Sequence, residues 1–429
     1  MALMKPIRTT KKLDENGGEE EALLMSPTSR MFHEPNYNLY VLAILGWKVP
    51  INVDAMKAEI QGKLLKHPRF SSLQVIDESD DSRNMKGIPT TVNLDDHIIV
   101  PDLKPNPNNM DTDKLVEDYI SNLSTASIDM AKPLWDLHIL NVKTSHAEAT
   151  CIFRLHHSIG DGVSLVSLLL SCFRKSSDPT SLPTLLVSSS SSSKGKSKFS
   201  NNRRSIRSLT WQYLVKLWSC ISLLFNTIVD VSMFVATALF LKDSQSPFTV
   251  PQGLKTSTRM RFVYRTVSLD DIKFIKNLTN STVNDVILGI TQAALSRYVH
   301  RKYEIEGKRN FSPQKMRCRA SVVMNLRPVL GVQGAAALAP RALSHTTLFF
   351  SNVVGPLEEV SLSGHPLAFI APTCYGQSTG IMVHGCSYAK KLTFAVAVDE
   401  GIIPDPNQLG DDFVESFRLI KEAALKIQS

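Results

Sequence analysis

The chain has 429 residues, 43% of them hydrophobic and 21% charged, which is long enough for two or three folded domains and too apolar for a disordered protein. Its formal net charge of +8 is typical of nucleic-acid-binding proteins, but the charge is local. The stretch between Asp178 and Asp230 has no acidic residue and holds seven basic ones: Lys194, Lys196, Lys198, Arg203, Arg204, Arg207 and Lys216. Because no motif that reads DNA or RNA accompanies this patch, we expect no nucleic-acid partner.

Residues 1–22 are polar and charged, and they predict a flexible tail without the apolar core of a secretory signal peptide. Residues 23–175 form the first half, which opens with Ser26 as N-cap of a short helix and Pro27 at its first position. Strands are predicted over residues 38–46, 72–76, 90–94, 97–100, 134–142 and 149–157. Helices are predicted over residues 53–65, 113–123 and 163–173. Strict strand–helix–strand alternation is missing, which favours an α/β or α+β sandwich over a doubly wound sheet.

Residues 176–216 change character, with prolines, six serines at 188–193 and the basic patch, and they predict a flexible linker. Residues 217–241 are mostly apolar and long enough to cross a hydrocarbon layer of about 30 Å. Asn226 and Asp230 interrupt them, and an aspartate near the membrane centre costs roughly 2.5–3.5 kcal/mol on insertion scales. A membrane-spanning helix, a helix in the membrane interface and a helix packed on the protein therefore all stay open.

Residues 256–429 form the second half. Strands are predicted over residues 260–267, 320–326, 349–356 and 392–398. Helices are predicted over residues 270–278, 281–295 and 413–427. The six cysteines are scattered without paired metal spacing, so we expect buried, reduced thiols in a protein that faces the cytosol.

One short stretch carries the chemistry: His156-His157-Ser158-Ile159-Gly160-Asp161-Gly162. It lies between a predicted strand and a predicted helix, where a histidine can stand at the mouth of a cleft. Adjacent strand residues point to opposite faces, so the two histidines cannot line one cleft together and are poor joint ligands for one metal. His157, next to the turn, is the better candidate for a general base, because a neutral imidazole can accept a proton from a hydroxyl or amine near neutral pH.

Asp161 lies between two glycines, Gly160 and Gly162, shortly after His157. Its carboxylate could orient the histidine directly, or it could bind an arginine and hold the turn closed. A glycine turn with two hydrogen-bonded histidines and no catalytic role is the alternative.

The pattern His-His-x-x-x-Asp-Gly resembles the signature of the thioester-dependent acyltransferases, which include chloramphenicol acetyltransferase and peptide-synthetase condensation domains. Four further segments resemble motifs of the wax ester synthase/diacylglycerol acyltransferase family: Pro133-Leu134-Trp135, Asn284-Asp285-Val286-Ile287-Leu288, Asn325-Leu326-Arg327-Pro328 and Ser351-Asn352-Val353-Val354-Gly355-Pro356. Ser26-Pro27 with Phe32, and the stretch from Val398 to Pro406, resemble the plant branch. The similarity spans nearly the whole chain in order.

This resemblance implies a two-domain chloramphenicol-acetyltransferase-like fold with a channel between the halves, and an enzyme that uses no cofactor and no metal. Acyl-CoA would enter the channel from one side, and a long-chain fatty alcohol or diacylglycerol from the other. His157 would deprotonate the acceptor hydroxyl, which then attacks the thioester carbonyl without a covalent acyl-enzyme.

The resemblance also implies roles for the other motif residues. Asp161 would pair with Arg327 as a structural anchor, with His156 and Gly162 as support for the motif. Asn284 and Asn352 are candidates for the substrate channel or for stabilising the oxyanion, and equally for a helix start and a turn. The resemblance and the basic patch together predict contact with membrane lipid, at the endoplasmic reticulum or also the plasma membrane, with both halves facing the cytosol.

One stretch departs from the family pattern. The family has several dozen residues after the motif that ends at Pro328, whereas this chain is shortened near residues 329–336. Such a deletion would remove part of the second half and of the wall around the acceptor channel. An inactive or impaired lipid-binding or scaffold form is therefore one alternative, and a soluble alcohol acyltransferase is another.

Overall fold

The computed structural model describes residues 23–34, 37–76, 85–104, 111–160, 162–184, 206–241, 243–244, 246–248, 259–305, 307, 316–323, 345–376 and 379–428. Several predictions fall outside these residues. They are the tail 1–22, most of the serine-rich linker, Asp161, Arg327 and the shortened stretch 329–336.

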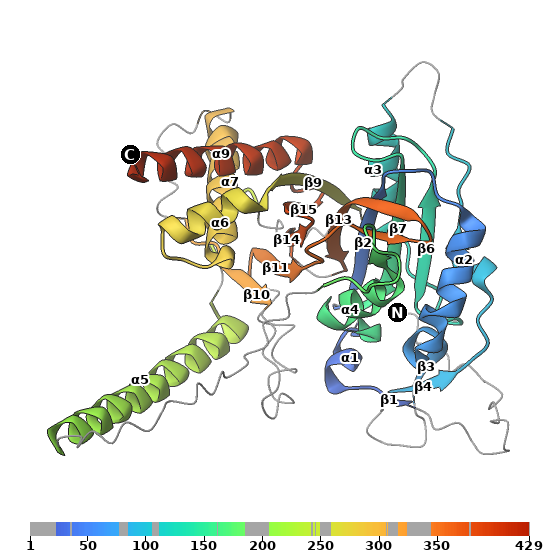
Figure 1. Cartoon of the computed structure of the whole chain (residues 1–429). Helices are drawn as coiled ribbons and strands as arrows, with labels where there is room; N and C mark the ends of the chain where they lie inside the picture. The colour runs from blue at the N-terminus through green and yellow to red at the C-terminus, as the bar shows by residue number, and fades with distance from the viewer. Residues whose placement is uncertain are drawn as a thin grey trace.

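Two large β-sheets form the centre of the described structure (Figure 1). The first sheet has seven strands in the order β5 (Ile98–Ile99), β6 (Trp135–Leu140), β7 (Ala149–His156), β2 (Tyr40–Trp47), β13 (His365–Tyr375), β12 (Val360–Leu362) and β8 (Arg174–Lys175). The second sheet has five strands in the order β10 (Ala320–Val323), β11 (Leu348–Val354), β14 (Ile381–Tyr388), β15 (Lys391–Asp399) and β9 (Met260–Ser268). A small third sheet pairs β1 (Leu23–Leu24), β4 (Met85–Pro89) and β3 (Ser72–Ile76).

Strands β12 and β13 belong to the second half of the sequence but complete the first sheet. β13 runs antiparallel to β2, with Tyr375 opposite Tyr40 and Phe369 opposite Gly46. The glycine is required there, because a Cβ on Gly46 would lie 2.1 Å from the Phe369 ring. The two halves of the chain are thereby joined through a shared sheet.

Helices pack against both sheets (Figure 1). One face of the first sheet packs on α2 (Val53–Gly62) and α4 (Gly162–Cys172), and the other lies against α3 (Thr112–Leu123). The second sheet carries α6 (Leu269–Leu278), α7 (Val283–Ile305) and α9 (Pro406–Gln428) over Ile381 and Val383. Its opposite face, which includes Met382, packs into the core of the first half.

Most predicted elements are confirmed, and the deviations have local causes. Ser26 caps α1 (Pro27–Met31), since its hydroxyl accepts a hydrogen bond from the Ser29 N–H at 3.1 Å. The strand predicted over 90–94 is wrong: the chain forms β4 just before it, and Asn93 then caps a short 3₁₀ turn.

The prediction that all six cysteines are buried is wrong for two of them. Cys220 and Cys318 are exposed, whereas Cys151, Cys172, Cys374 and Cys386 are buried.

The apolar segment forms α5 (Ile206–Leu239), which extends away from the rest of the protein (Figure 1). Its span Leu214–Leu239 is long and apolar enough to cross a membrane, and only 6% of an 18-residue apolar window within it is buried. The hydroxyls of Ser219, Thr227 and Thr237 each donate to the carbonyl four residues earlier at 2.8 Å, so they are satisfied without water. In the described structure this helix does not pack along the body of the protein.

The C-terminal end of α5 is anchored to the second half. The carbonyl oxygen of Thr237 lies 2.5 Å from His345 Nδ1. Just beyond the helix, the buried carboxylate of Asp243 binds Arg319 at 2.8 Å and accepts the Thr347 hydroxyl at 2.6 Å. Because Arg319 and Thr347 directly precede β10 and β11, the base of α5 is fixed to the edge of the second sheet.

A buried ion pair joins β6 and β7 within the first sheet. Arg154 donates to Asp136 at 2.5 Å, and its guanidinium also donates to the carbonyls of Leu123 and Ala126 at the end of α3. Burial alone would raise the pKa of the Asp136 carboxyl, but hydrogen bonds from His138 and Arg154 outweigh it, so the pKa lies below its ordinary value. The pair therefore fixes α3 to the sheet with both charges compensated.

We predict that Arg154→Met lowers the free energy of unfolding by about 3–5 kcal/mol, because it leaves the Asp136 carboxylate buried without its cation. Urea unfolding in mild detergent measures the change. The exposed pair Lys104–Asp102 provides the control, since Lys104→Met should leave the unfolding midpoint unchanged. A midpoint for Arg154→Met equal to that of Lys104→Met would contradict the assignment.

Candidate active site

The histidine pair lies where β7 ends and the chain turns into a helix. His156 is the last residue of β7, and His157 begins a 3₁₀ turn, His157–Ile159. Gly162 then starts α4. The predicted strand–turn–helix arrangement around the motif is confirmed, with the strand ending one residue before His157.

His156 is buried and its ring nitrogens are both occupied by the protein. Nε2 lies 2.8 Å from Asn38 Oδ1, and Nδ1 lies 2.6 Å from the hydroxyl of Ser158, which is in turn 2.6 Å from Gln74. Burial, together with the neighbouring His33 and His157, lowers the pKa of His156 to about 2. This imidazole cannot act as a base near neutral pH and instead holds the strand end in place.

His157 meets a different environment. Its backbone N–H donates to the carbonyl of Leu39 at 2.8 Å, which fixes the start of the turn against the residues before β2. Its ring stacks on Phe32, with ring centroids 4.2 Å apart, and Phe32 stacks in turn on Tyr37. The segment that follows α1 therefore covers one face of the imidazole, and the side chain is held in one orientation.

The second half contributes a further histidine that the sequence alone did not reveal. His384 lies on β14, on the same face as Met382, and is 6% exposed. Its Nε2 is 3.5 Å from the sulfur of Cys374 on β13. Burial and the nearby His157 lower the pKa of His384 to about 4. Side-chain alternation along β14 could have predicted that His384 faces inward. Its position relative to the histidine motif depends on how the two halves pack and could not be predicted from the sequence.

Asn284 and Asn352 are brought together by the fold. Asn352 Nδ2 on β11 donates to Asn284 Oδ1, in the first turn of α7, at 2.6 Å. A Cβ on the neighbouring Gly385 would lie 2.9 Å from Asn352 Oδ1, so a larger residue there would disturb the pair. The hydrogen bond ties the start of α7 to the second sheet, and a place for either residue on the substrate channel stays a prediction.

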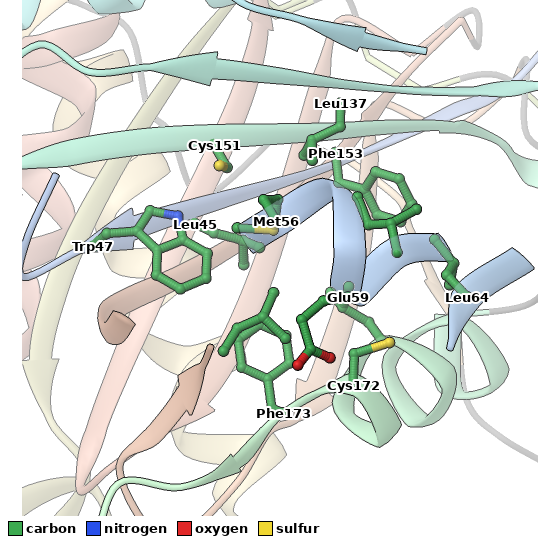
Figure 2. Close-up of a pocket in the computed structure, with 13 residues that line it drawn as sticks. Leu45, Trp47, Met56, Glu59, Leu64, Leu137, Cys151, Phe153, Cys172 and Phe173 are labelled. Carbon is green, nitrogen blue, oxygen red and sulfur yellow. The ribbon is translucent and has the colours of Figure 1, made fainter. Parts of the chain in front are cut away.

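The described part of the chain includes an apolar hollow and a polar one. An apolar cavity of about 30 Å³ lies between the first sheet and the helices α2 and α4, with Trp47, Cys151 and Phe173 in its lining (Figure 2). That volume holds about one water molecule and no acyl chain. A polar hollow of about 460 Å³ lies where α3 meets β9, and its lining balances Arg261, Arg265 and a lysine against three carboxylates.

Two family models match the chain over most of its length. The wax ester synthase/diacylglycerol acyltransferase catalytic domain matches residues 36–287, and the WS/DGAT C-terminal domain matches residues 295–421. The histidine motif lies inside the first match, and His384 lies inside the second.

Among known proteins, wax ester synthase/diacylglycerol acyltransferase 5 of Arabidopsis thaliana is 38% identical over 478 residues, which covers 94% of each chain. Wax ester synthase/diacylglycerol acyltransferase 11 of the same plant is 36% identical over 489 residues, with 97% of this chain and 98% of the relative covered. Both alignments are longer than the 429 residues of this chain, so each relative has residues that this chain lacks.

Solved structures agree on the fold. A wax ester synthase/diacylglycerol acyltransferase from Marinobacter aquaeolei VT8 superposes with a TM-score of 0.59 at 14% identity, over 94% of this chain and 99% of that one. The condensation domain of the Monacolin K polyketide synthase MokA superposes with a TM-score of 0.51 at 8% identity, over 94% and 98% of the two chains. At these identities the likeness shows the fold alone, and it confirms the predicted two-domain acyltransferase architecture.

We predict that His156 makes folding sensitive to acid. Its pKa is lowered on folding, so below about pH 6.5 the unfolded chain binds a proton that the folded protein does not, and stability falls as the pH falls. Between pH 7.5 and 5.5, His156→Gln should therefore lose about 1 kcal/mol less stability than the wild type. Urea unfolding at both pH values measures this, and His300→Gln, at an exposed position on α7, should keep the wild-type loss. Equal losses in the wild type and in His156→Gln would refute the prediction.

Proposed function

The chain belongs to the wax ester synthase/diacylglycerol acyltransferase family, and we propose that it transfers a long-chain fatty acyl group from acyl-CoA to a fatty alcohol or to diacylglycerol, with His157 as general base. The observation that carries the assignment is the contrast between the two histidines. His156 has both nitrogens engaged by the protein, whereas His157 stands at the strand end beside groups from both halves.

The proposed reaction needs one proton carrier. His157 accepts the proton of the acceptor hydroxyl as its oxygen attacks the thioester carbonyl. The carbonyl π electrons move to the oxygen, and the resulting tetrahedral intermediate collapses with cleavage of the carbon–sulfur bond. The CoA thiolate then takes the proton from His157, which returns the imidazole to its neutral form. Asp161 and Arg327 would hold the turn that carries His157.

We predict that His157→Ala lowers kcat by about 10²–10⁴, the contribution typical of a general base. The measurement is transfer from radiolabelled palmitoyl-CoA to hexadecanol or dioleoylglycerol, with the product resolved by thin-layer chromatography. His300→Ala, at an exposed position on α7, serves as the control and should match the wild type. Equal turnover by the wild type and His157→Ala would remove His157 from the base assignment.

Membrane association is the second part of the proposal, at the cytosolic face of the endoplasmic reticulum. It is supported by α5, whose large apolar side chains are exposed: Trp218 is 71% and Phe225 65% accessible. The basic residues before and at the start of this helix suit an anionic lipid surface. A lipid environment for α5 would place the protein where long-chain alcohols and diacylglycerol are dissolved.

We predict that the double substitution Leu224→Asp and Ile228→Asp abolishes flotation of the protein with liposomes of phosphatidylcholine and phosphatidylserine, because each new charge is costly in the hydrocarbon layer. Leu419→Asp with Leu425→Asp, at exposed apolar positions on α9, is the matched control and should float normally. Undiminished flotation of the α5 variant would contradict the proposal. Labelling of Cys220 by a membrane-impermeant maleimide distinguishes a membrane-spanning α5 from one that lies in the membrane interface, since a spanning helix protects this thiol.

A lipid-binding form with little turnover is the second candidate. It is favoured by the length of the alignments, which shows that relatives carry residues missing from this chain. The transfer assay decides between the two candidates: liposome binding without product from any acceptor supports the lipid-binding form.

A further inference from the structure

The proposed transfer reaction leaves one charge unaccounted for, and the following inference rests on that proposed function. When the acceptor oxygen attacks the thioester, the carbonyl oxygen becomes an oxyanion, and a hydrogen-bond donor aimed at it is among the largest contributions to such catalysis. Asn284 and Asn352, the candidates from the sequence, bond to each other on the face of the second sheet that carries α7. A donor on the opposite face, the one that packs against the first half, fits the reaction better.

His384 occupies that opposite face. In the register of the second sheet it lies opposite Ser351 of β11, and its ring centroid is 5.9 Å from that of Phe349. Strand alternation places it with Met382, which belongs to the core of the first half, while Ile381 and Val383 point to the helices. The contact with Cys374 of β13 confirms that the imidazole reaches the first sheet.

Cys374 determines which nitrogen of His384 carries the proton. Burial raises the pKa of this thiol far above its ordinary value, so the sulfur keeps its proton and can donate it. The sulfur lies 3.4 Å from Met382 Sδ and 3.5 Å from His384 Nε2. An imidazole nitrogen is a stronger acceptor than a thioether sulfur, so the S–H points to Nε2. In the neutral ring the remaining proton is then on Nδ1, which is a donor.

Nδ1 of His384 is a buried polar atom without a hydrogen-bond partner in the part of the chain that the structure describes. Buried donors almost always have a partner, so an orphaned one calls for an explanation. The low pKa of His384, which burial and the neighbouring His157 produce, keeps the ring neutral at physiological pH. The register of the first sheet places Cys374, the contact of His384, near the motif: Cys374 lies opposite Val41 of β2, and Val41 lies opposite Leu155, two residues before His157.

We propose that the Nδ1–H of His384 donates a hydrogen bond to the oxyanion that forms from the thioester carbonyl oxygen while His157 holds the proton of the acceptor hydroxyl. When the carbon–sulfur bond breaks, the oxyanion returns its electron pair to the carbonyl, the CoA thiolate takes the proton from His157, and Nδ1 keeps its own proton throughout. The site is then assembled from both halves: the base comes from the end of β7 and the oxyanion donor from β14.

Three variants test this assignment. His384→Phe fills the space without a donor, His384→Asn keeps an amide N–H near the position of Nδ1, and Met382→Leu changes a neighbour on the same face of β14. In the palmitoyl-CoA transfer assay we expect kcat to fall about 10²–10³-fold for His384→Phe, with the KM for acyl-CoA little changed. His384→Asn should recover at least tenfold over His384→Phe, and Met382→Leu should stay within about threefold of the wild type. The acid limb of the pH profile should be the same in the wild type and in His384→Asn, because His157 remains the base.

Each outcome decides the proposal. A folded His384→Phe with the kcat of the wild type overturns it, and so does an acid limb that moves in His384→Asn, which would make His384 the base. If His384→Phe does not fold, as circular dichroism would show, Cys374 provides the second test. Cys374→Ser keeps a donor to Nε2 and should retain kcat, whereas Cys374→Ala should lose several-fold, and equal kcat values overturn the proposal. A wild type without product from any acceptor refutes the proposed function instead.

Discussion

Strand β13 lies beside β2 in the first sheet although it comes from the second half of the sequence, and the rest of the structure depends on this pairing. Phe369 packs over Gly46, where any side chain would collide with the ring. The chain turns at the end of β13 and continues as β14 in the second sheet, so the two sheets must lie close to each other at this point. Cys374 and His384, on the two sides of that turn, are brought into contact as a result.

In the histidine motif, burial and hydrogen bonding give two identical side chains different environments for proton transfer. His156 is enclosed by Asn38, Ser158 and the ring of His33, and its pKa is too low for proton transfer near neutral pH. His157 is one residue further along but already in the 3₁₀ turn, where its ring leaves the sheet and stacks on Phe32. The first histidine thus stabilises the strand end from which the second is presented.

Helix α5, which forms an arm, and the body of the protein differ in how they place their apolar side chains. The body buries its apolar side chains between two sheets and their helices. In contrast, α5 exposes side chains such as Trp218, and the Ser219 hydroxyl donates to a carbonyl within the helix. The carboxylate of Asp243 fixes the base of the arm beside β10 and β11. The base of α5 and the second sheet, which carries His384, are therefore linked through Asp243.

Local sequence patterns determined most of the elements, the turn that carries His157, and the family, because N-caps, strand alternation and a dense motif act over a few residues. Ser26 caps its helix and β7 ends at the motif as the pattern predicted. The sequence did not reveal that β13 joins the first sheet, nor that His384 of the second sheet contacts Cys374 of the first, since such arrangements depend on the packing of whole sheets. Tertiary structure alone decided which polar side chains form hydrogen bonds within the fold, as His156 and the Asn284–Asn352 pair do, because these bonds join residues far apart in the sequence.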